Sequence, residues 1–266
     1  MPDTAVTNAC PITCTDAAVL SLDALNITSP KVERAITIAV YGDTHNKHAL
    51  IKNPPACDLL IHVGDFTGLG TVNEICSFTD WIRKAYPSTP IIVIDGNHER
   101  FKKPAYVYSS PDRSRIPASQ EAKERLFQNA NIHYLASGQS VEIFGLTITG
   151  LPWENDGDSA YQQIEISQQT NIMVSHCPPK GFLDREKTDD PQFGSEVIKD
   201  KILGLPNLSA CFFGHAHLAR GALGLNKGDG KKLLLINAAM AGGPGYSERI
   251  HEGLADCMLV QVYPES

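Results

Sequence analysis

The chain has few of the features that mark specialised classes of protein. Its seven cysteines are scattered and include no C-x-x-C pair, which argues against a disulfide framework and predicts free, buried thiols. No apolar run approaches the ~20 residues that a membrane-spanning helix requires. The first residues show no basic start followed by an apolar core, so no signal peptide is expected and a cytoplasmic location is the default expectation.

The chain also has fewer basic than acidic residues. The 23 Lys and Arg residues are outnumbered by 30 Asp and Glu residues, which gives a formal net charge of −7. A protein that binds DNA or RNA broadly carries a basic face, so this balance argues against a nucleic-acid groove. Divalent cations held at a site would add local positive charge that the formal count ignores, so an acidic chain can still attract a phosphate group.

The chain does have the length and balance of one large globular domain, with 266 residues of which 42% are hydrophobic and 20% charged. Residues 1–34 carry Pro, Thr, Asn and Ser with weak periodicity, so we expect an N-terminal extension there. A short helix is expected within it over Asp16–Leu25. Residues 35–266 are expected to form the main domain.

From Ala35 onward, a short apolar and β-branched run repeatedly ends in a polar motif that contains Gly, Asp, Asn or His. Apolar runs of this length are typical of strands buried on both faces, and strands joined by crossover helices predict a layered α/β fold. The six runs are AITIAVY (35–41), CDLLIHV (57–63), PIIVI (90–94), NIMVS (171–175), ACFF (210–213) and KLLLI (232–236).

Other elements are predicted from local signals. Thr71 and Glu74 form a capping-box pattern, and apolar residues at helical spacing follow, so a surface helix is expected there. A second helix is expected over Gln120–Asn129, and a hairpin turn around Asn226–Gly230. Phe101–Pro117, with three prolines, is expected to be a long irregular loop, which is uncommon unless it serves a site or is disordered.

Five of the predicted strands end in residue types that bind divalent metals. In open α/β sheets, ligands bind outside the carboxyl ends of the strands, so these side chains are expected to converge. Two of the motifs place candidate ligands two residues apart, which directs both side chains of an extended chain to one side. The candidate ligands are Asp43, His45, Asp65, Asn97, His176, His215 and His217.

A single Gly-Asp or Asn-His motif is a weak signal, because an isolated histidine is more often an ordinary surface or core residue. Five such motifs in order, each at a strand end, are more specific, and they contain five of the nine histidines. Mixed carboxylate, imidazole and amide ligands favour Mn, Fe or Zn over an all-oxygen Mg or Ca site. Asp65 has two carboxylate oxygens, which would let it bridge two cations.

The motifs GDTH (42–45), GDFTG (64–68), GNHE (96–99), SH (175–176) and GHAH (214–217) resemble the signature set of the calcineurin-like metallophosphoesterase superfamily. The resemblance covers about residues 36–263 and is closest to the branch with the vertebrate metallophosphoesterase-domain proteins and class III phosphodiesterases. It implies an α/β/β/α sandwich with two central mixed sheets flanked by helices. It also makes residues 35–266 a metallophosphoesterase catalytic domain.

The resemblance implies two metal positions. One takes Asp43, His45, Asp65 and His217, and the other takes Asp65, Asn97, His176 and His215, with Asp65 as the bridge together with a hydroxide. It implies two catalytic residues as well. Asn97 would ligate through its carbonyl oxygen and keep its NH2 group as a donor, and His98 would lie near the leaving-group oxygen. A purely structural role for His98 is the alternative.

The implied activity is metal-dependent hydrolysis of a phosphate ester, with a small phosphodiester such as a cyclic nucleotide as the first expectation. Phosphomonoesterase, protein phosphatase and nuclease activities are alternatives, and a non-enzymatic metal-bound scaffold is a further one. Other residues have ordinary expectations: His62 and Cys177 are expected to be buried core residues, and Trp153 either lines a pocket or packs. The remaining histidines, His48, His133 and His251, are expected at the surface.

Overall fold

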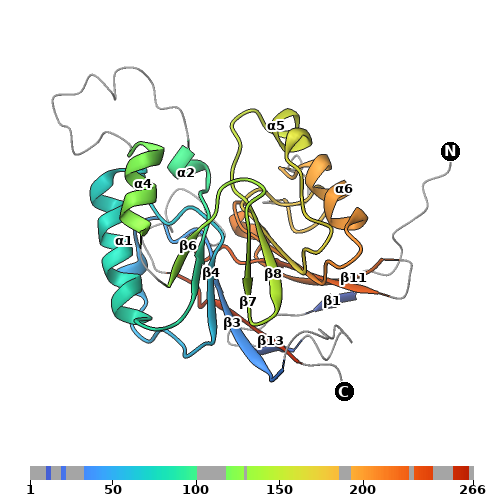
Figure 1. The fold of residues 1–266 in the computed structure, drawn as a ribbon, viewed down its shortest axis with the longest axis horizontal. Helices are drawn as coiled ribbons and strands as arrows, with labels where there is room; N and C mark the ends of the chain where they lie inside the picture. The colour runs from blue at the N-terminus through green and yellow to red at the C-terminus, as the bar shows by residue number, and fades with distance from the viewer. Residues whose placement is uncertain are drawn as a thin grey trace.

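A computed structural model describes residues 10–12, 19–21, 33–100, 118–128, 131–185, 193–227, 231–241 and 254–263. Two mixed β-sheets form the middle of the molecule, and helices cover their outer faces (Figure 1). This is the α/β/β/α sandwich that the family resemblance implies, so the predicted fold is confirmed. The predicted loop Phe101–Pro117 lies outside the described residues.

Sheet A has seven strands in the order β1-β11-β12-β10-β9-β8-β7. The four strands β12, β10, β9 and β8 run parallel to one another, whereas β11 pairs with β12, β7 pairs with β8 and β1 pairs with β11 in antiparallel fashion. The strands of sheet A are β1 (Cys10–Ile12), β7 (Ser140–Ile143), β8 (Leu146–Leu151), β9 (Ile172–Ser175), β10 (Ala210–Phe213), β11 (Gly221–Asn226) and β12 (Lys232–Asn237).

Sheet B has six strands in the order β2-β13-β3-β4-β5-β6, of which β3 to β6 are parallel. The strands of sheet B are β2 (Val19–Ser21), β3 (Ile36–Tyr41), β4 (Leu59–His62), β5 (Ile91–Val93), β6 (Ile132–Tyr134) and β13 (Met258–Val262). Each of the six apolar runs therefore forms a strand, and each lies in the parallel part of a sheet, where both faces are covered.

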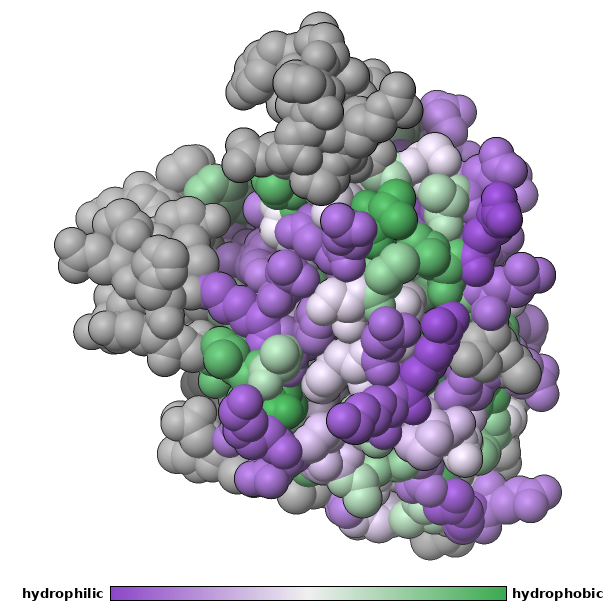
Figure 2. Space-filling view, turned by 90° about the vertical axis from the view of Figure 1, so that its left-hand side faces the viewer, coloured by the Kyte–Doolittle hydropathy of each residue, from purple (hydrophilic) through white to green (hydrophobic). Residues whose placement is uncertain are grey.

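Helices on the outer faces complete the sandwich. The helices are α1 (Val72–Ala85), α2 (Asn97–Arg100), α4 (Gln120–Phe127), α5 (Asp158–Gln163) and α6 (Glu196–Gly204), with the 3-10 turns η2 (His48–Leu50) and η4 (His217–Ala219). Phe78 of α1 and Phe127 of α4 pack on sheet B, and Tyr161 of α5 and Ile198 of α6 pack on sheet A. The outward face of the side that carries α1 and α4 is mostly hydrophilic (Figure 2).

The pleat of β3 shows how the core is divided between these layers. Ile38 and Val40 face the second sheet, whereas Ala39 and Tyr41 face the helices on the outside. Because alternate side chains of a strand point to opposite faces, a continuous apolar run can serve both layers at once. Because both faces of these strands are buried, the positions of the strand ends are well determined. The polar motifs begin at these ends.

The helix signals are confirmed with one adjustment. The Thr71 side chain accepts a hydrogen bond from the Glu74 N–H, and the Glu74 carboxylate accepts one from the Thr71 N–H, so α1 begins with a complete capping box. The predicted helix Gln120–Asn129 ends earlier, at Phe127, because Gln128 is already extended. The hairpin is confirmed by the antiparallel pairing of β11 with β12, although residues 228–230 at its tip lie outside the described residues.

Two expectations are wrong. Val19–Ser21, predicted as part of a helix, forms a strand that pairs in parallel with β13. Pairing with a sheet edge outweighs a weak local preference. His48, expected at the surface, is 2% exposed because its ring packs on Phe78 and Trp81.

The remaining minor expectations can be stated briefly. His62 is fully buried and Cys177 is buried, as expected. The five cysteines at positions 57, 76, 177, 211 and 257 are free, although three of them are only half-buried. His133 is half-buried, and His251 lies outside the described residues. In the described part of the chain, no helix has both the length and the apolar character required to span a membrane.

Candidate metal centre

The five polar motifs meet where the parallel strands of both sheets end. The loops after β3, β4 and β5 bring donor groups from sheet B, and the loops after β9 and β10 bring donor groups from sheet A. All seven predicted ligands lie in these loops or at the first residue of the helical turns that follow them. The arrangement is the one expected for parallel α/β sheets, where the carboxyl ends of the strands form the binding edge.

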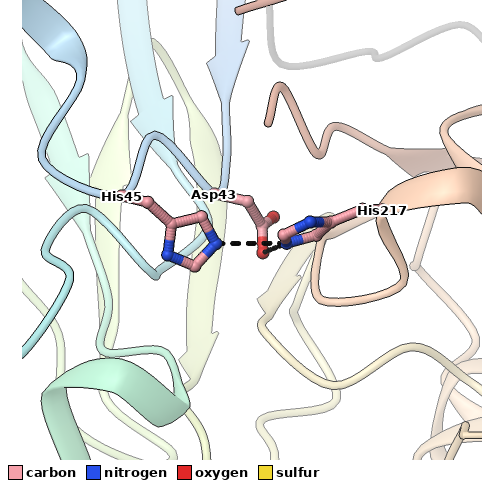
Figure 3. Close-up of side chains that lie close together, drawn as sticks. All are labelled: Asp43, His45 and His217. Atoms are coloured by element: carbon pink, nitrogen blue, oxygen red, sulfur yellow. Dashed lines mark hydrogen bonds and ion pairs between the residues drawn. The ribbon is translucent and has the colours of Figure 1, made fainter. Parts of the chain in front are cut away.

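Asp43, His45 and His217 form the first group of donor atoms (Figure 3). The Nε2 atoms of His45 and His217 are 3.1 Å apart, and the His217 Nε2 is 3.2 Å from Asp43 Oδ1. Two imidazole nitrogens at this distance would face each other with lone pairs unless a proton or a cation lies between them. The group thus offers one carboxylate and two imidazoles to a single small cation.

Asn97, His176 and His215 form the second group. The Asn97 Oδ1 atom is 2.9 Å from His176 Nε2 and 2.8 Å from His215 Nδ1. Ring nitrogens from two strands of sheet A therefore point at an amide oxygen supplied by sheet B. This group offers two imidazole nitrogens and one amide oxygen, a set that suits a first-row transition metal or zinc.

Asp65 lies between the two groups. Its Oδ2 atom is 3.8 Å from His45 Nε2, which belongs to the first group, and 3.5 Å from His176 Nε2, which belongs to the second. The carboxyl group is 2% exposed, and its other oxygen, Oδ1, accepts a hydrogen bond of 2.9 Å from the His98 backbone N–H. Of the seven predicted ligands, this carboxylate has the position that a shared ligand requires.

The protonation states of the imidazoles suit metal binding. Burial lowers the pKa of His45 to about 3 and the pKa of His215 to about 3, so both rings are neutral near pH 7. Burial alone would raise the pKa of Asp43, but the hydrogen bond from His217 and the nearby histidines hold that pKa below its usual range. A charged carboxylate beside neutral imidazoles is the ligand chemistry that divalent metals require.

The surroundings also fix which nitrogen of His176 faces the site. Its Nδ1 atom is 2.9 Å from the Val63 carbonyl oxygen, which can only accept a hydrogen bond. Nδ1 therefore carries the proton, and Nε2 of the neutral ring presents its lone pair to Asn97 and Asp65. Orientation of a ligating histidine by a carbonyl group in this way is a common feature of metal sites.

Four of the seven candidate ligands have a strained backbone. Asp43, His45, Asp65 and His215 all have positive φ values, of 51°, 42°, 54° and 70°. Left-handed backbone costs non-glycine residues of order 1 kcal/mol or more each, and such residues cluster at functional sites. The expectation of an extended chain at the two motifs with ligands two residues apart is therefore wrong, because the chain turns through left-handed backbone where it leaves the strands.

Two glycines allow the carboxylates to come this close to the backbone. A Cβ atom at Gly96 would lie 2.1 Å from Asp65 Oδ1, and one at Gly214 would lie 2.2 Å from Asp43 Oδ2. Both contacts are far shorter than any Cβ atom tolerates, so both positions require glycine. The neutral imidazoles, the shared carboxylate and these close approaches fit a site for two divalent cations, as the sequence predicts.

His98 occupies a different position from the ligands. Its Nδ1 atom is 2.6 Å from the Gly68 carbonyl oxygen, so Nδ1 donates and Nε2 faces the site, 3.9 Å from Asp65 Oδ2. The ring packs edge-on against His45, and 31% of its side chain is exposed. The His98 side chain is more exposed than those of His45 and Asp65, and its ring lies close enough to both to form a third possible metal-binding group with them.

Glu99 is a site residue that the sequence analysis missed. It is 5% exposed, and its carboxyl group accepts hydrogen bonds from the backbone N–H groups of Asp65, Gly96 and Thr67 and from the Thr67 hydroxyl. It therefore joins the Asp65 loop to the Asn97 turn. Burial raises its pKa to about 8, with the nearby carboxylates adding to the effect. Its place at the end of the GNHE motif was the only available signal.

Trp153 lies on the sheet A side of the site. Its ring centroid is 4.8 Å from that of His215 and 6.0 Å from that of His176. The ring also packs on the core beneath α5 and α6. The expectation that Trp153 packs is therefore confirmed, and whether it lines a pocket stays a prediction.

The fold and the site define a two-sheet α/β protein with a candidate centre for two metals. A family model described as calcineurin-like phosphoesterase matches residues 36–219, a stretch that contains all seven predicted ligands. The match covers more than half of the chain, and the chain belongs to this family. The predicted resemblance is confirmed.

Several known proteins are similar in sequence. Metallophosphoesterase domain-containing protein 1 of Homo sapiens is 27% identical over 223 residues, which cover 77% of this chain and 68% of that protein. A UPF0046 protein of Caenorhabditis elegans is 28% identical over 213 residues, or 74% of each chain. Probable rhamnogalacturonate lyase C of Emericella nidulans is 29% identical over 192 residues, which cover 70% of this chain but 17% of that much longer protein.

A solved structure of the 5′-nucleotidase precursor from Thermus thermophilus aligns with 86% of this chain at 12% identity, with a TM-score of 0.43. This chain spans 54% of that protein. A TM-score of this size is too low to support a conclusion about this chain. The lyase and nucleotidase names describe proteins of which this chain spans only a part.

Proposed function

We propose that the protein hydrolyses a phosphate ester at a centre with two divalent metal ions. The observation that carries the proposal is the position of Asp65, whose Oδ2 lies within 4 Å of one imidazole nitrogen from each donor group. Membership of the calcineurin-like phosphoesterase family supports the class of reaction. Cations held close together by a shared carboxylate are a recurring device in phosphate-ester hydrolysis.

The donor groups support a specific ligand assignment. One metal would be held by Asp43, His45, Asp65 and His217, and the other by Asp65, Asn97, His176 and His215. Each set combines nitrogen and oxygen donors, which favours Mn, Fe or Zn. When bound, the two cations would supply a nucleophile derived from water near neutral pH and stabilise negative charge on the phosphoryl oxygens.

The chain itself would contribute a proton donor and a positioned amide. His98 presents Nε2 toward the site while its Nδ1 is held by the Gly68 carbonyl group, so a protonated ring can transfer the Nε2 proton to the leaving-group oxygen. Proton donation of this kind contributes roughly 10²–10⁴-fold to the rate. Asn97 uses its amide oxygen toward His176 and His215, which leaves its NH2 group as a donor for a phosphoryl oxygen.

For the substrate, we propose a small phosphodiester such as a cyclic nucleotide. The formal net charge of −7 disfavours a long nucleic acid, which requires a basic surface. A proton donor at His98 is of most use for an alkoxide leaving group, such as a sugar hydroxyl, because that group leaves poorly without a proton. A phosphomonoester or a phosphoprotein would use the same metal chemistry and is the alternative.

The test is a combined metal and activity analysis. Protein stripped of metal would be supplied with Mn²⁺, Zn²⁺ and Mg²⁺ in turn and assayed on bis-nitrophenyl phosphate, nitrophenyl phosphate, cyclic nucleotides, dinucleotides and phosphoproteins. We expect two equivalents of metal per chain and turnover of diesters with Mn²⁺ or Zn²⁺. Two bound equivalents without turnover of any ester would instead favour a metal-bound scaffold and contradict the proposal.

A further inference from the structure

The proposed ligands come from two different sheets, so the two donor groups must be held in register across the sandwich. Asp43 and His45 follow β3 in sheet B, whereas His215 and His217 follow β10 in sheet A. The sheets themselves are joined through apolar side chains, which resist separation but allow small shifts. Directional contacts between the ligand loops are needed to set their relative position within fractions of an ångström.

Residues 237–241 provide such contacts. They begin with the last residue of β12 and cross from one sheet to the other at the site. The Ala238 N–H donates to the Phe213 carbonyl of sheet A at 2.7 Å, and the Met240 N–H donates to the Gly42 carbonyl at the end of β3 at 3.0 Å. The Ala241 N–H donates to the carbonyl of Asp43, a proposed ligand, at 3.2 Å. This segment lies outside the region 36–219 that the family model matches.

The side chain of Asn237 extends these contacts to the loop between the two ligand histidines. Its amide nitrogen donates to the Ala216 carbonyl at 2.8 Å and to the Leu183 carbonyl at 3.0 Å. Its amide oxygen accepts from the Ala239 N–H at 3.1 Å. Asn237 is fully buried, and both of its N–H groups are used, so the amide can adopt only this orientation.

Ala216 separates His215 from His217, so its carbonyl group belongs to the peptide unit that joins the two candidate ligands. The loop at His215 is strained, with φ of 70°, and so is the loop at Leu183, with φ of 51°. Both strained loops are hydrogen-bonded to the same amide. The Ala216 carbonyl also accepts the Ala219 N–H at 3.1 Å, so Asn237 ties this turn to the end of β12 and to the Leu183 loop. Hydrogen bonds to two strained loops from one buried amide stabilise these loops in the conformation observed.

We propose that Asn237 is a positioning residue, which sets His215 and His217 for metal binding by holding the Ala216 carbonyl. Only an amide fits this role. The side chain must donate hydrogen bonds to the Ala216 and Leu183 carbonyl oxygens and also accept one from the Ala239 N–H. Asp in its place would present a second acceptor to both carbonyl groups. Ser has a single O–H donor, so it could bond only one of the two carbonyl groups and would lose the link between the Ala216 and Leu183 loops.

The inference rests on the proposed metal centre and is tested by metal affinity, not by activity alone. Asn237→Asp and Asn237→Ser would be compared with Asn171→Asp in the full chain. Asn171 is a matched control because its side chain also bonds two backbone groups, the Thr147 N–H and the Asn207 carbonyl, just before β9 begins and thus at the opposite end of the strands. Calorimetric titration of the metal-free proteins with Mn²⁺ gives affinity, and thermal unfolding of the same samples gives stability.

We expect Mn²⁺ binding to weaken by roughly 10–100-fold in both Asn237 variants, the size typical for groups that orient ligands. Asn171→Asp is expected to lower the unfolding temperature and leave the affinity unchanged. Raised Mn²⁺ should restore turnover in Asn237→Ser. Unchanged affinity in a folded Asn237→Ser protein would show a merely structural role and overturn the inference. Absence of Mn²⁺ and Zn²⁺ binding by the unsubstituted protein would overturn the metal centre itself.

Discussion

The Nδ1 atom of His98 lies 2.6 Å from the carbonyl oxygen of Gly68, and this contact decides which nitrogen of His98 can act on a substrate. The carbonyl group holds the proton on Nδ1, so only Nε2 can gain or lose a proton at the site. The same contact restricts the rotation of the His98 ring. It also joins the loop after β4, which contains Gly68, to the turn after β5, which contains His98.

His98→Gln should keep metal binding but slow turnover, because the amide can donate a hydrogen bond but cannot transfer a proton. We expect a loss of about 10²–10⁴-fold for alkyl leaving groups and a much smaller loss for nitrophenyl esters, which leave without a proton. The measurement is kcat with a series of diesters of graded leaving-group pKa. Equal slowing across the series would argue for a structural role.

Asp65→Asn should remove metal from both positions, because a neutral amide cannot serve two cations as an anionic shared ligand. We expect less than one equivalent of bound metal and no detectable turnover, with the chain still folded. Metal content after dialysis, together with circular dichroism, checks the result. Asp58→Asn is the control, since Asp58 pairs with Arg34 at the surface, and it should keep both metals. Full activity of the Asp65 variant would refute the ligand assignment.

Gly214→Ala should damage the first donor group without touching a ligand. The added Cβ would lie 2.2 Å from Asp43 Oδ2, so either the carboxylate or the loop must move. We expect weakened metal binding together with a loss of stability. Gly204→Ala is a matched control, because no atom lies within 4 Å of its Cβ position at the end of α6, and there we expect a gain of up to about 1 kcal/mol. Equal behaviour of the two variants would contradict the close-approach argument.

The parallel strands, and the meeting of the candidate ligands at the ends of these strands, could be predicted from the sequence because their signals are local. Each apolar run is followed directly by its polar motif, and parallel topology brings the ends of such runs together. His45 and His217 are 172 positions apart in the chain, and the ordered set of five motifs marks both, whereas either motif alone is a weak signal.

Features that depend on distant partners could not be predicted in this way. The roles of Glu99 and Asn237 come from backbone groups that other loops supply, and neither residue type reveals those partners. The strand at Val19–Ser21 depends on pairing with β13, about 240 residues later, and local propensity carries no information on that pairing. His48 is buried because of aromatic side chains on α1, and the sequence around it reads as an ordinary polar turn.

The metal-free protein should lose stability as pH falls below about 6.5, and His62 should contribute. The Gly64 N–H donates to His62 Nδ1, so the neutral ring donates from Nε2 to the Thr44 hydroxyl, and burial lowers the pKa of His62 to about 3. Between pH 6.5 and 3, the unfolded chain binds a proton at this histidine that the folded chain does not bind. The free energy of unfolding therefore falls by about 1.4 kcal/mol per pH unit from this group.

His62→Gln keeps a hydrogen-bonding amide and removes this titration. The variant is expected to be less stable than the unsubstituted protein at pH 7, but the difference should shrink by about 2 kcal/mol between pH 6.5 and pH 5. Denaturant unfolding at several pH values measures it. His133→Gln is the control, because His133 is only half-buried on β6. Between pH 6.5 and pH 5, the stability difference between this variant and the unsubstituted protein should change far less. Parallel pH profiles for the His62 variant and the unsubstituted protein would show that His62 does not titrate as argued.

Removal of residues 1–32 should leave the metal centre and expose two sheet edges. β1 pairs with β11 at the edge of sheet A, and β2 pairs with β13 at the edge of sheet B. Without them, β11 and β13 become edge strands with unpaired backbone groups, which promote association between chains. We expect larger species in light scattering and unchanged Mn²⁺ affinity, because all proposed ligands follow residue 42. Removal of residues 1–9 alone keeps both strands and should change neither property; if the longer truncation also leaves the size and the unfolding temperature unchanged, the two strands do not protect the edges.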